Sequence, residues 1–227
     1  MTLCIIPARG GSKRIPRKNI KDFLGKPILA YSIEAALESE CFDQVIVSTD
    51  DQEIAHLSLK YGAQVPFIRP DELSDDFSNT FSVIKHAVEE GKIKDTESVC
   101  CLYATAPFID ADTINDSYKK FTQSNANYCL GVTSFAFPIQ RALRISNMNL
   151  LEMFNQDNSD KRSQDLAEAY HDAGQFCWGK SSAFKQGLPL YTNSTIPYIL
   201  KRDLVQDIDT NEDWLRAETL YKFLKSG

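Results

Sequence analysis

Short apolar runs alternate with amphipathic stretches through roughly the first 130 residues of this 227-residue chain. β-branched and aliphatic runs predict buried strands at 3–6, 45–47, 64–68, 99–102 and 128–133. Between these runs, apolar residues at helical spacing predict helices at about 26–37, 51–62, 80–88 and 110–121. The alternation of strand and helix favours an α/β fold with a doubly wound, mainly parallel sheet.

The alternation lapses between residues 134 and 170. We interpret this stretch as an inserted arm, with short antiparallel strands at 139–145 and 150–154 and a polar loop at 155–165, because structureless loops of that length are uncommon inside compact domains. We expect the arm to pair subunits and the chain to form one domain over 1–227. Strand character returns at 171–178, and Thr210 with Asp213 predicts a capping box at the start of the last helix.

Composition is that of a globular protein, with 43% apolar and 25% charged residues. The formal net charge of −6 argues against a general nucleic-acid binder. No apolar run approaches the ~20 residues of a membrane span, and we find no signal-peptide pattern. Six cysteines without C-x-x-C spacing are expected to be buried and reduced. We therefore expect a cytoplasmic protein that contacts neither membrane nor nucleic acid.

A basic loop follows the first apolar run. Residues 9–21 contain no acidic residue and carry Arg9, Lys13, Arg14, Arg17, Lys18 and Lys21. Gly10 and Gly11 tolerate positive φ and close approach, so backbone N–H groups could face an anion that lysine and arginine neutralise. The Walker A and dinucleotide patterns are both absent. The loop predicts a cradle for a triphosphate, with a solvated basic loop as the alternative.

Two aspartates near the C-terminus form a second candidate site. Asp207 and Asp209 would share one face of an extended segment, with Ile208 on the other face. Such a pair can hold Mg²⁺ together with substrate phosphates. Alternatively, Asp209 begins the last helix and Asp207 is a solvated surface charge. His171 and Asp172 are adjacent on a strand, so they face opposite ways and imply no catalytic dyad.

The basic loop also carries a family signature. The run Pro7-Ala8-Arg9-Gly10-Gly11-Ser12-Lys13, continued by Ile15-Pro16 and Lys18-Asn19, resembles that of the acylneuraminate cytidylyltransferases, the CMP-sialic acid synthetase family. The likeness continues through 45–50, 69–73 and 207–210, so it covers nearly the whole chain. The segment 171–176 is similar to the pseudaminic acid branch of that family.

The resemblance implies a three-layer, Rossmann-like nucleotide-diphospho-sugar transferase fold and dependence on Mg²⁺. It implies CTP as co-substrate, a nonulosonic acid as the sugar, and a homodimer whose arm reaches toward the partner's site. Pseudaminic acid is the sugar that the branch favours, with legionaminic and N-acetylneuraminic acid as alternatives. A non-catalytic nucleotide-binding protein is the alternative from another class.

By matching positions, the resemblance also implies residue roles. The nucleotide would be bound by Ala8, Arg9, Gly10, Gly11, Lys13, Lys18, Asn19, Arg69, Ser78 and Thr80. Within this group, Arg9, Lys13 and Lys18 would be catalytic. Tyr103, Arg162 and Gln175 would bind the sugar, and Asp207 and Asp209 would hold the metal. The chain departs from the family pattern at Arg14, at Tyr103 and at 173–174, which favours a nonulosonic acid other than sialic acid and leaves Arg14 without a role.

Overall fold

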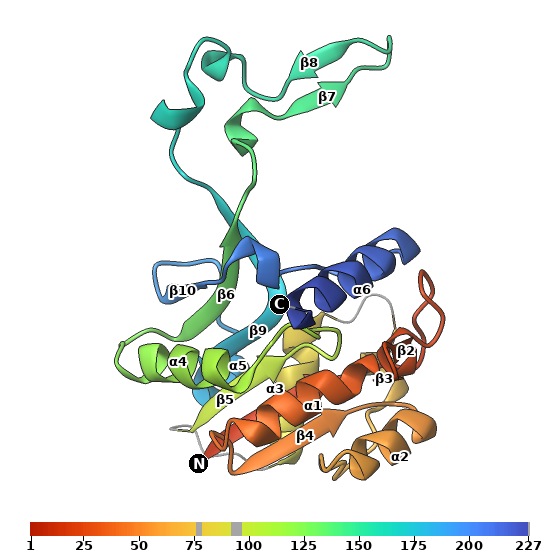
Figure 1. The fold of residues 1–227 in the computed structure, drawn as a ribbon. Coiled ribbons are helices and arrows are strands. Elements are labelled where there is room, and N and C mark those ends of the chain that lie inside the picture. The colour runs from red at the N-terminus through yellow and green to blue at the C-terminus, as the bar shows by residue number, and fades with distance from the viewer. Residues whose placement is uncertain (76–78, 92–96, 227) are drawn as a thin grey trace.

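A six-stranded sheet organises the protein in a computed structural model that describes residues 1–75, 79–91 and 97–226 (Figure 1). The strand order is β10-β6-β9-β5-β1-β4. The strands are β1 (Thr2–Pro7), β4 (Gln44–Ser48), β5 (Ser98–Leu102), β6 (Tyr128–Ser134), β9 (Tyr170–Lys180) and β10 (Thr195–Ile199). β9 runs antiparallel to β5 and β6, and the other pairings are parallel. The predicted α/β class with a mainly parallel mixed sheet is confirmed.

Helices cover both faces of the sheet. One apolar cluster joins it to α1 (Ile28–Glu38), α2 (Gln52–Lys60) and α4 (Ala111–Thr122), and a second joins the other face to α3 (Thr80–Glu90) and α5 (Ser181–Gln186). Neighbouring residues such as Ile5 and Ile6 fall in different clusters because side chains alternate along a strand. The result is three layers, helix on sheet on helix.

The last helix, α6 (Asn211–Lys225), packs in a third apolar cluster. This cluster contains Ile15 from the basic loop and Ile208 from the segment before α6, both buried, together with Trp214. Because Ile15 and Ile208 are buried in the same cluster, the N-terminal loop is held beside the C-terminal segment. The predicted capping box of Thr210 and Asp213 is confirmed at the start of α6.

An arm of residues 135–169 leaves the body between β6 and β9, drawn in teal in Figure 1. It contains the antiparallel pair β7 (Leu143–Ile145) and β8 (Leu151–Met153), so the predicted antiparallel strands are confirmed in shorter form. Residues 139–141, predicted as strand, form a 3₁₀ turn. Large apolar side chains are exposed along the arm, among them Phe137, Ile145, Met148, Leu151 and Phe154.

Two sequence-based boundaries differ from the structure. The strand predicted at 64–68 is reduced to isolated bridges from Gln64 and Ile68, since Pro66 between them cannot donate to a ladder. Lys26-Pro27 forms β3, paired with β2 (Asp22–Phe23), so the helix predicted from residue 26 begins two residues later, at Ile28. The remaining short elements are 3₁₀ turns at Lys18–Ile20, Asp71–Leu73, Gln156–Asn158, Ser163–Asp165 and Arg202–Leu204.

The cysteine prediction is confirmed: all six are free thiols, and five are buried. Burial raises the pKa of the half-exposed Cys41 thiol to about 11, which keeps it protonated at neutral pH. Among the residues that the structure describes, no helix combines the length and apolar character needed to cross a membrane.

Candidate active site

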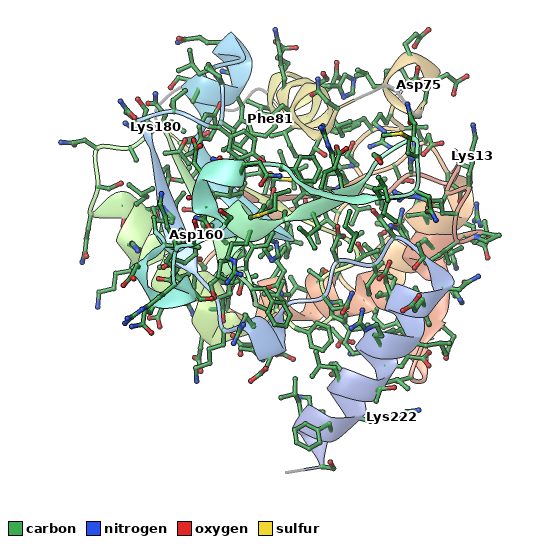
Figure 2. All side chains as sticks on the ribbon, turned by 90° about the horizontal axis from the view of Figure 1, so that it is seen from above. Lys13, Asp75, Phe81, Asp160, Lys180 and Lys222 are labelled. Atoms are coloured by element: carbon green, nitrogen blue, oxygen red, sulfur yellow. The ribbon has the colours of Figure 1, made fainter. Side chains whose placement is uncertain are left out.

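A cavity of about 310 Å³ opens where β1 and β5 end. The carboxyl ends of strands are the usual ligand-binding edge of an open α/β sheet. Six of the residues predicted to bind nucleotide line the cavity, namely Arg9, Lys13, Lys18, Asn19, Arg69 and Thr80. Tyr103 and Asp209 line it as well. Figure 2, viewed from above, shows Lys13 and Asp75 on the same side of the molecule, and Asp75 also borders the cavity.

Gly10 is needed for close contact with the end of β4. Its N–H donates to Oδ1 of Asp50 at 3.0 Å, and a Cβ at this position would lie 2.7 Å from Oδ2 of Asp51. Neither loop glycine has positive φ, so of the two properties named from the sequence Gly10 uses close approach. Gly11 is exposed, and a Cβ there would meet nothing within 4 Å, so it leaves room for a ligand to approach the backbone.

Hydrogen bonds to backbone carbonyl oxygens hold the rest of the loop. Asn19 donates from Nδ2 to the Arg9 carbonyl oxygen at 2.9 Å, and Arg9 donates to the Asp75 carbonyl oxygen at 2.6 Å. The buried N–H of Ala8 donates to the Ser48 carbonyl oxygen at 2.9 Å. Ala8 and Asn19 therefore shape the loop, whereas the guanidinium of Arg9 reaches the cavity.

Arg69 reaches the cavity from the segment that follows the α2 turn. It is buried, lies 3.5 Å from Oδ1 of Asp50, and donates from Nε to Ser74 at 3.0 Å. Burial lowers the pKa of Arg69, and the charge of Asp50 opposes that shift. A buried cation that lines the cavity is well placed to meet an anionic or carbonyl-rich ligand.

Arg17 has a different role from the other basic residues of the loop. Its guanidinium pairs with Asp51 and Glu53, and Asp51 caps α2 by accepting from the N–H groups of Glu53 and Ile54. The pair lowers the pKa of Asp51 to about 2. Arg17 thus anchors the loop to α2 and does not line the cavity.

Lys18 joins the two ends of the chain. Its Nζ donates to the Ile208 carbonyl oxygen at 2.6 Å and lies 3.4 Å from Oδ1 of Asp209. Arg14 contacts the same Asp209 oxygen at 2.9 Å. Two cations of the basic loop, Arg14 and Lys18, therefore lie beside the same carboxylate oxygen of Asp209 at the edge of the cavity.

Asp207 lies on the far side of Ile208, next to β9. Gly174 of β9 has φ +62°, and a Cβ there would stand 3.5 Å from Oδ1 of Asp207. Burial and then the negative charge of Asp209 raise the pKa of Asp207, while Lys18 lowers it. The two carboxylates are thus close enough to repel one another, which a cation between them would relieve.

The donor chemistry of this pair fits Mg²⁺, a hard cation that prefers oxygen ligands. No group of three or more His, Cys, Asp or Glu side chains suited to a metal occurs among residues 1–75, 79–91 and 97–226. The chain would therefore contribute the two carboxylates and leave the other positions to phosphate oxygens and water, which is the usual pattern for Mg²⁺ at phosphate sites.

The three residues predicted to bind sugar have different positions. Tyr103 lines the cavity, and its side chain hydrogen-bonds to Thr80. Gln175 is buried and donates from Nε2 to the Leu204 carbonyl oxygen, away from the cavity lining. Arg162 is exposed on the arm. Within one chain, the structure brings only Tyr103 to the cavity; Ser78, predicted to bind nucleotide, lies outside the described residues.

A second cavity of about 550 Å³ shares Thr80 and Tyr103 with the first. It is bordered by Asp172, Lys85 and Tyr191, none of which the sequence suggested. Asp172 accepts from the Gly174 N–H at 2.8 Å, and burial raises the pKa of its carboxyl. The signal that could have found it is an acidic residue at the start of a strand whose following residues, from Ala173 to Gly179, are mostly buried.

The sequence model of one known protein family matches nearly the whole chain. The sequence model of the family described as "Cytidylyltransferase" matches residues 3–223. The chain belongs to the cytidylyltransferase family. The family resemblance stated from the basic loop is therefore confirmed, and the chain is a nucleotidyltransferase by family.

Individual relatives support the same family, and a solved structure has a similar fold. The chain is 48% identical to the "Pseudaminic acid cytidylyltransferase" of Campylobacter jejuni, over 97% of this chain and 96% of that protein. It is 33% identical to the "N-acylneuraminate cytidylyltransferase" of Escherichia coli, over 96% of this chain and 51% of that protein. The fold resembles that of a CMP:2-keto-3-deoxy-manno-octonic acid synthetase complexed with CTP, with a TM-score of 0.71, 15% identity, and coverage of 98% and 99% of the two chains.

Proposed function

We propose that this protein activates pseudaminic acid, a nonulosonic acid, by transferring the cytidylyl group of CTP to it, which yields CMP-pseudaminic acid and pyrophosphate. The observation that carries the proposal is the pairing of a basic loop with Asp209 across one cavity, in a chain 48% identical over nearly its whole length to a pseudaminic acid cytidylyltransferase. Because the co-substrate CTP is a cytoplasmic nucleotide, we place the activity in the cytoplasm.

In this reaction the anomeric hydroxyl of the sugar attacks the α-phosphorus of CTP. A sugar oxygen–phosphorus bond forms, the bond to pyrophosphate breaks, and the hydroxyl proton is released. Arg9, Lys13 and Lys18 neutralise the negative charge that grows on the leaving pyrophosphate. Positioning and charge neutralisation are the contributions expected from protein groups in such transfers, and no covalent intermediate on the protein is required.

Asp207 and Asp209 hold Mg²⁺ in this proposal. Bound Mg²⁺ would supply positive charge to the phosphate oxygens and lower the pKa of the attacking hydroxyl. The proposal is supported by the carboxylate chemistry of the pair. Burial and then the nearby negative charge of Asp209 raise the pKa of Asp207, and a bound cation would offset both effects.

The sugar acid occupies the second cavity, which meets the nucleotide cavity at Thr80 and Tyr103. Lys85 offers a cation for the sugar carboxylate, and Asp172 offers an acceptor for amide or hydroxyl groups at the other end. Asp172→Asn should raise the KM for the sugar about tenfold or more and leave the KM for CTP within about twofold. An unchanged sugar KM removes Asp172 from this role.

The exposed apolar arm supports a homodimer. Five large apolar side chains are exposed on this one arm, namely Phe137, Ile145, Met148, Leu151 and Phe154. Exposed apolar side chains gathered on one element are typical of an interface. In this arrangement Arg162, exposed on the arm, would meet the sugar carboxylate in the partner's site. An Arg162→Ala enzyme with an unchanged sugar KM would remove Arg162 from sugar binding.

The experiment that tests the proposed reaction follows pyrophosphate release from CTP and Mg²⁺ with pseudaminic, legionaminic or N-acetylneuraminic acid added separately. We expect sugar-dependent release that is fastest with pseudaminic acid. The alternative of a non-catalytic nucleotide-binding protein predicts CTP binding without release in every reaction. Fastest release with one of the other two sugars would keep the reaction and change the substrate.

A further inference from the structure

The family resemblance gives no role to Arg14 of the basic loop. Its guanidinium contacts Oδ1 of Asp209 at 2.9 Å, and Lys18 lies 3.4 Å from that same oxygen. Arg14, Lys18 and Asp209 all line the nucleotide cavity. The oxygen that would bind a metal is therefore already contacted by two cations.

These two cations differ in how firmly they are held. Lys18 is only 20% exposed, and the Ile208 carbonyl oxygen fixes its Nζ at 2.6 Å. The Arg14 side chain is 68% exposed, so it can rotate away from Asp209 at little cost. A planar guanidinium also binds phosphate oxygens in pairs, which makes a triphosphate a stronger partner than one shared carboxylate oxygen.

We propose that Arg14 exchanges partners during nucleotide binding. It pairs with Asp209 while the site is empty, moves to the triphosphate when CTP arrives, and thereby releases Asp209 for the metal. The inference rests on the proposed function, in which Asp209 is a metal ligand. Because coupling between two ligands is reciprocal, CTP must raise the affinity for the metal and the metal must raise the affinity for CTP by the same factor.

The test measures binding and does not use turnover. Mn²⁺ replaces Mg²⁺ because it shares the preference for oxygen ligands and its free form is counted by electron paramagnetic resonance. Without nucleotide, Arg14→Gln should bind Mn²⁺ about two- to fivefold more tightly than the wild type, the factor expected for loss of an exposed ion pair. In metal-free buffer, the same variant should bind CTP more weakly by about threefold or more.

Opposite changes in the two affinities are the signature of partner exchange, since general damage to the loop would weaken both. Lys21→Gln is the matched control, because it removes one positive charge from the same segment while its Nζ lies over the Trp214 ring, 4.3 Å from the centroid. We expect it to keep both affinities near wild-type values. The exchange is overturned if Arg14→Gln leaves Mn²⁺ binding unchanged or weaker, or if Lys21→Gln reproduces its effects.

Asp209→Asn separates this inference from the proposed reaction. If it binds Mn²⁺ as tightly as the wild type, both the metal assignment and the exchange are wrong. If the Mn²⁺ and CTP affinities of Arg14→Gln change in opposite directions while the wild type transfers cytidylyl to none of the sugar acids, the exchange stands and the proposed function fails.

Discussion

Lys18 donates a hydrogen bond from Nζ to the Ile208 carbonyl oxygen at 2.6 Å, joining segments 190 residues apart in the sequence. Ile15 and Ile208 belong to the same two segments and are buried in one apolar cluster, which holds the segments together. The basic loop and the two candidate metal ligands therefore share one core. A change that loosens this core should disturb both halves of the site together.

The first prediction concerns Lys18 and Asp209. Lys18→Ala and Asp209→Asn should each lower kcat/KM for CTP at least about 100-fold, because each removes a charge aimed at the reacting phosphates or their cation. Pyrophosphate release measures the effect, and circular dichroism checks the fold. Lys222→Ala, an exposed change on α6 outside the cavity lining (Figure 2), is the matched control and should behave like the wild type. Near-normal pyrophosphate release by either of these two variants would show that the substituted residue does not have the role proposed for it.

Gly10 and Gly11 provide a matched pair for stability. Gly10→Ala should lower Tm by several degrees, because its Cβ would stand 2.7 Å from Oδ2 of Asp51 and force the loop or the cap of α2 to move. Gly11→Ala meets nothing within 4 Å and should leave Tm within about 1 °C of the wild type. Thermal unfolding of the two variants gives the answer. Equal Tm values would mean that Gly10 is not required for this contact.

Asp51 predicts a dependence of stability on pH. Its pKa is lowered to about 2 from 3.8, so the charged carboxylate stabilises the folded protein above about pH 4, and this contribution disappears as the pH falls toward 2. Asp51→Asn keeps a residue able to cap α2 but loses the ion pair with Arg17. It should lower Tm at pH 7 by a few degrees, consistent with about 1 kcal/mol, and the difference should shrink toward pH 2. A difference that stays constant with pH would contradict the ion pair.

The arm predicts a change of oligomeric state. Ile145→Asp places a charge in the exposed apolar surface of β7 and should weaken the proposed dimer at least about tenfold, because burying an isoleucine contributes about 1.5–3 kcal/mol. Light scattering coupled to size-exclusion chromatography compares it with the wild type. Asn147→Asp adds the same charge in the exposed turn beside it and serves as the control. A wild-type protein that is monomeric in this measurement would contradict the proposed dimer.

Local patterns were sufficient to predict much of the fold. The central strands and the main helices have strong periodicity, and the capping box at Thr210 requires only two residues three positions apart in the chain. The elements that were missed have weak patterns. β10 is an edge strand interrupted by Pro197, and α5 spans six residues, too few to display helical periodicity.

The site was harder to predict where it depends on packing between distant segments. The loop and the Asp207–Asp209 pair were found from residue type, but the contact of Arg14 with Asp209 exists because Ile15 and Ile208 share one core. Gly10 was selected because glycine tolerates positive φ and close approach, and the structure uses only the second property, with Asp51 as the neighbour. Asp172 borders the second cavity only because β9 lies between β5 and β6.

The proposed activity is the transfer of the cytidylyl group of CTP to pseudaminic acid. A competition measures it most directly: one reaction contains CTP, Mg²⁺ and equimolar pseudaminic, legionaminic and N-acetylneuraminic acids, and mass spectrometry quantifies the CMP-sugars at low conversion. The product ratio equals the ratio of kcat/KM values. We expect CMP-pseudaminic acid to be the main product, and a mixture in which another CMP-sugar is the main product, or which contains no CMP-sugar, would show that the proposed activity is wrong.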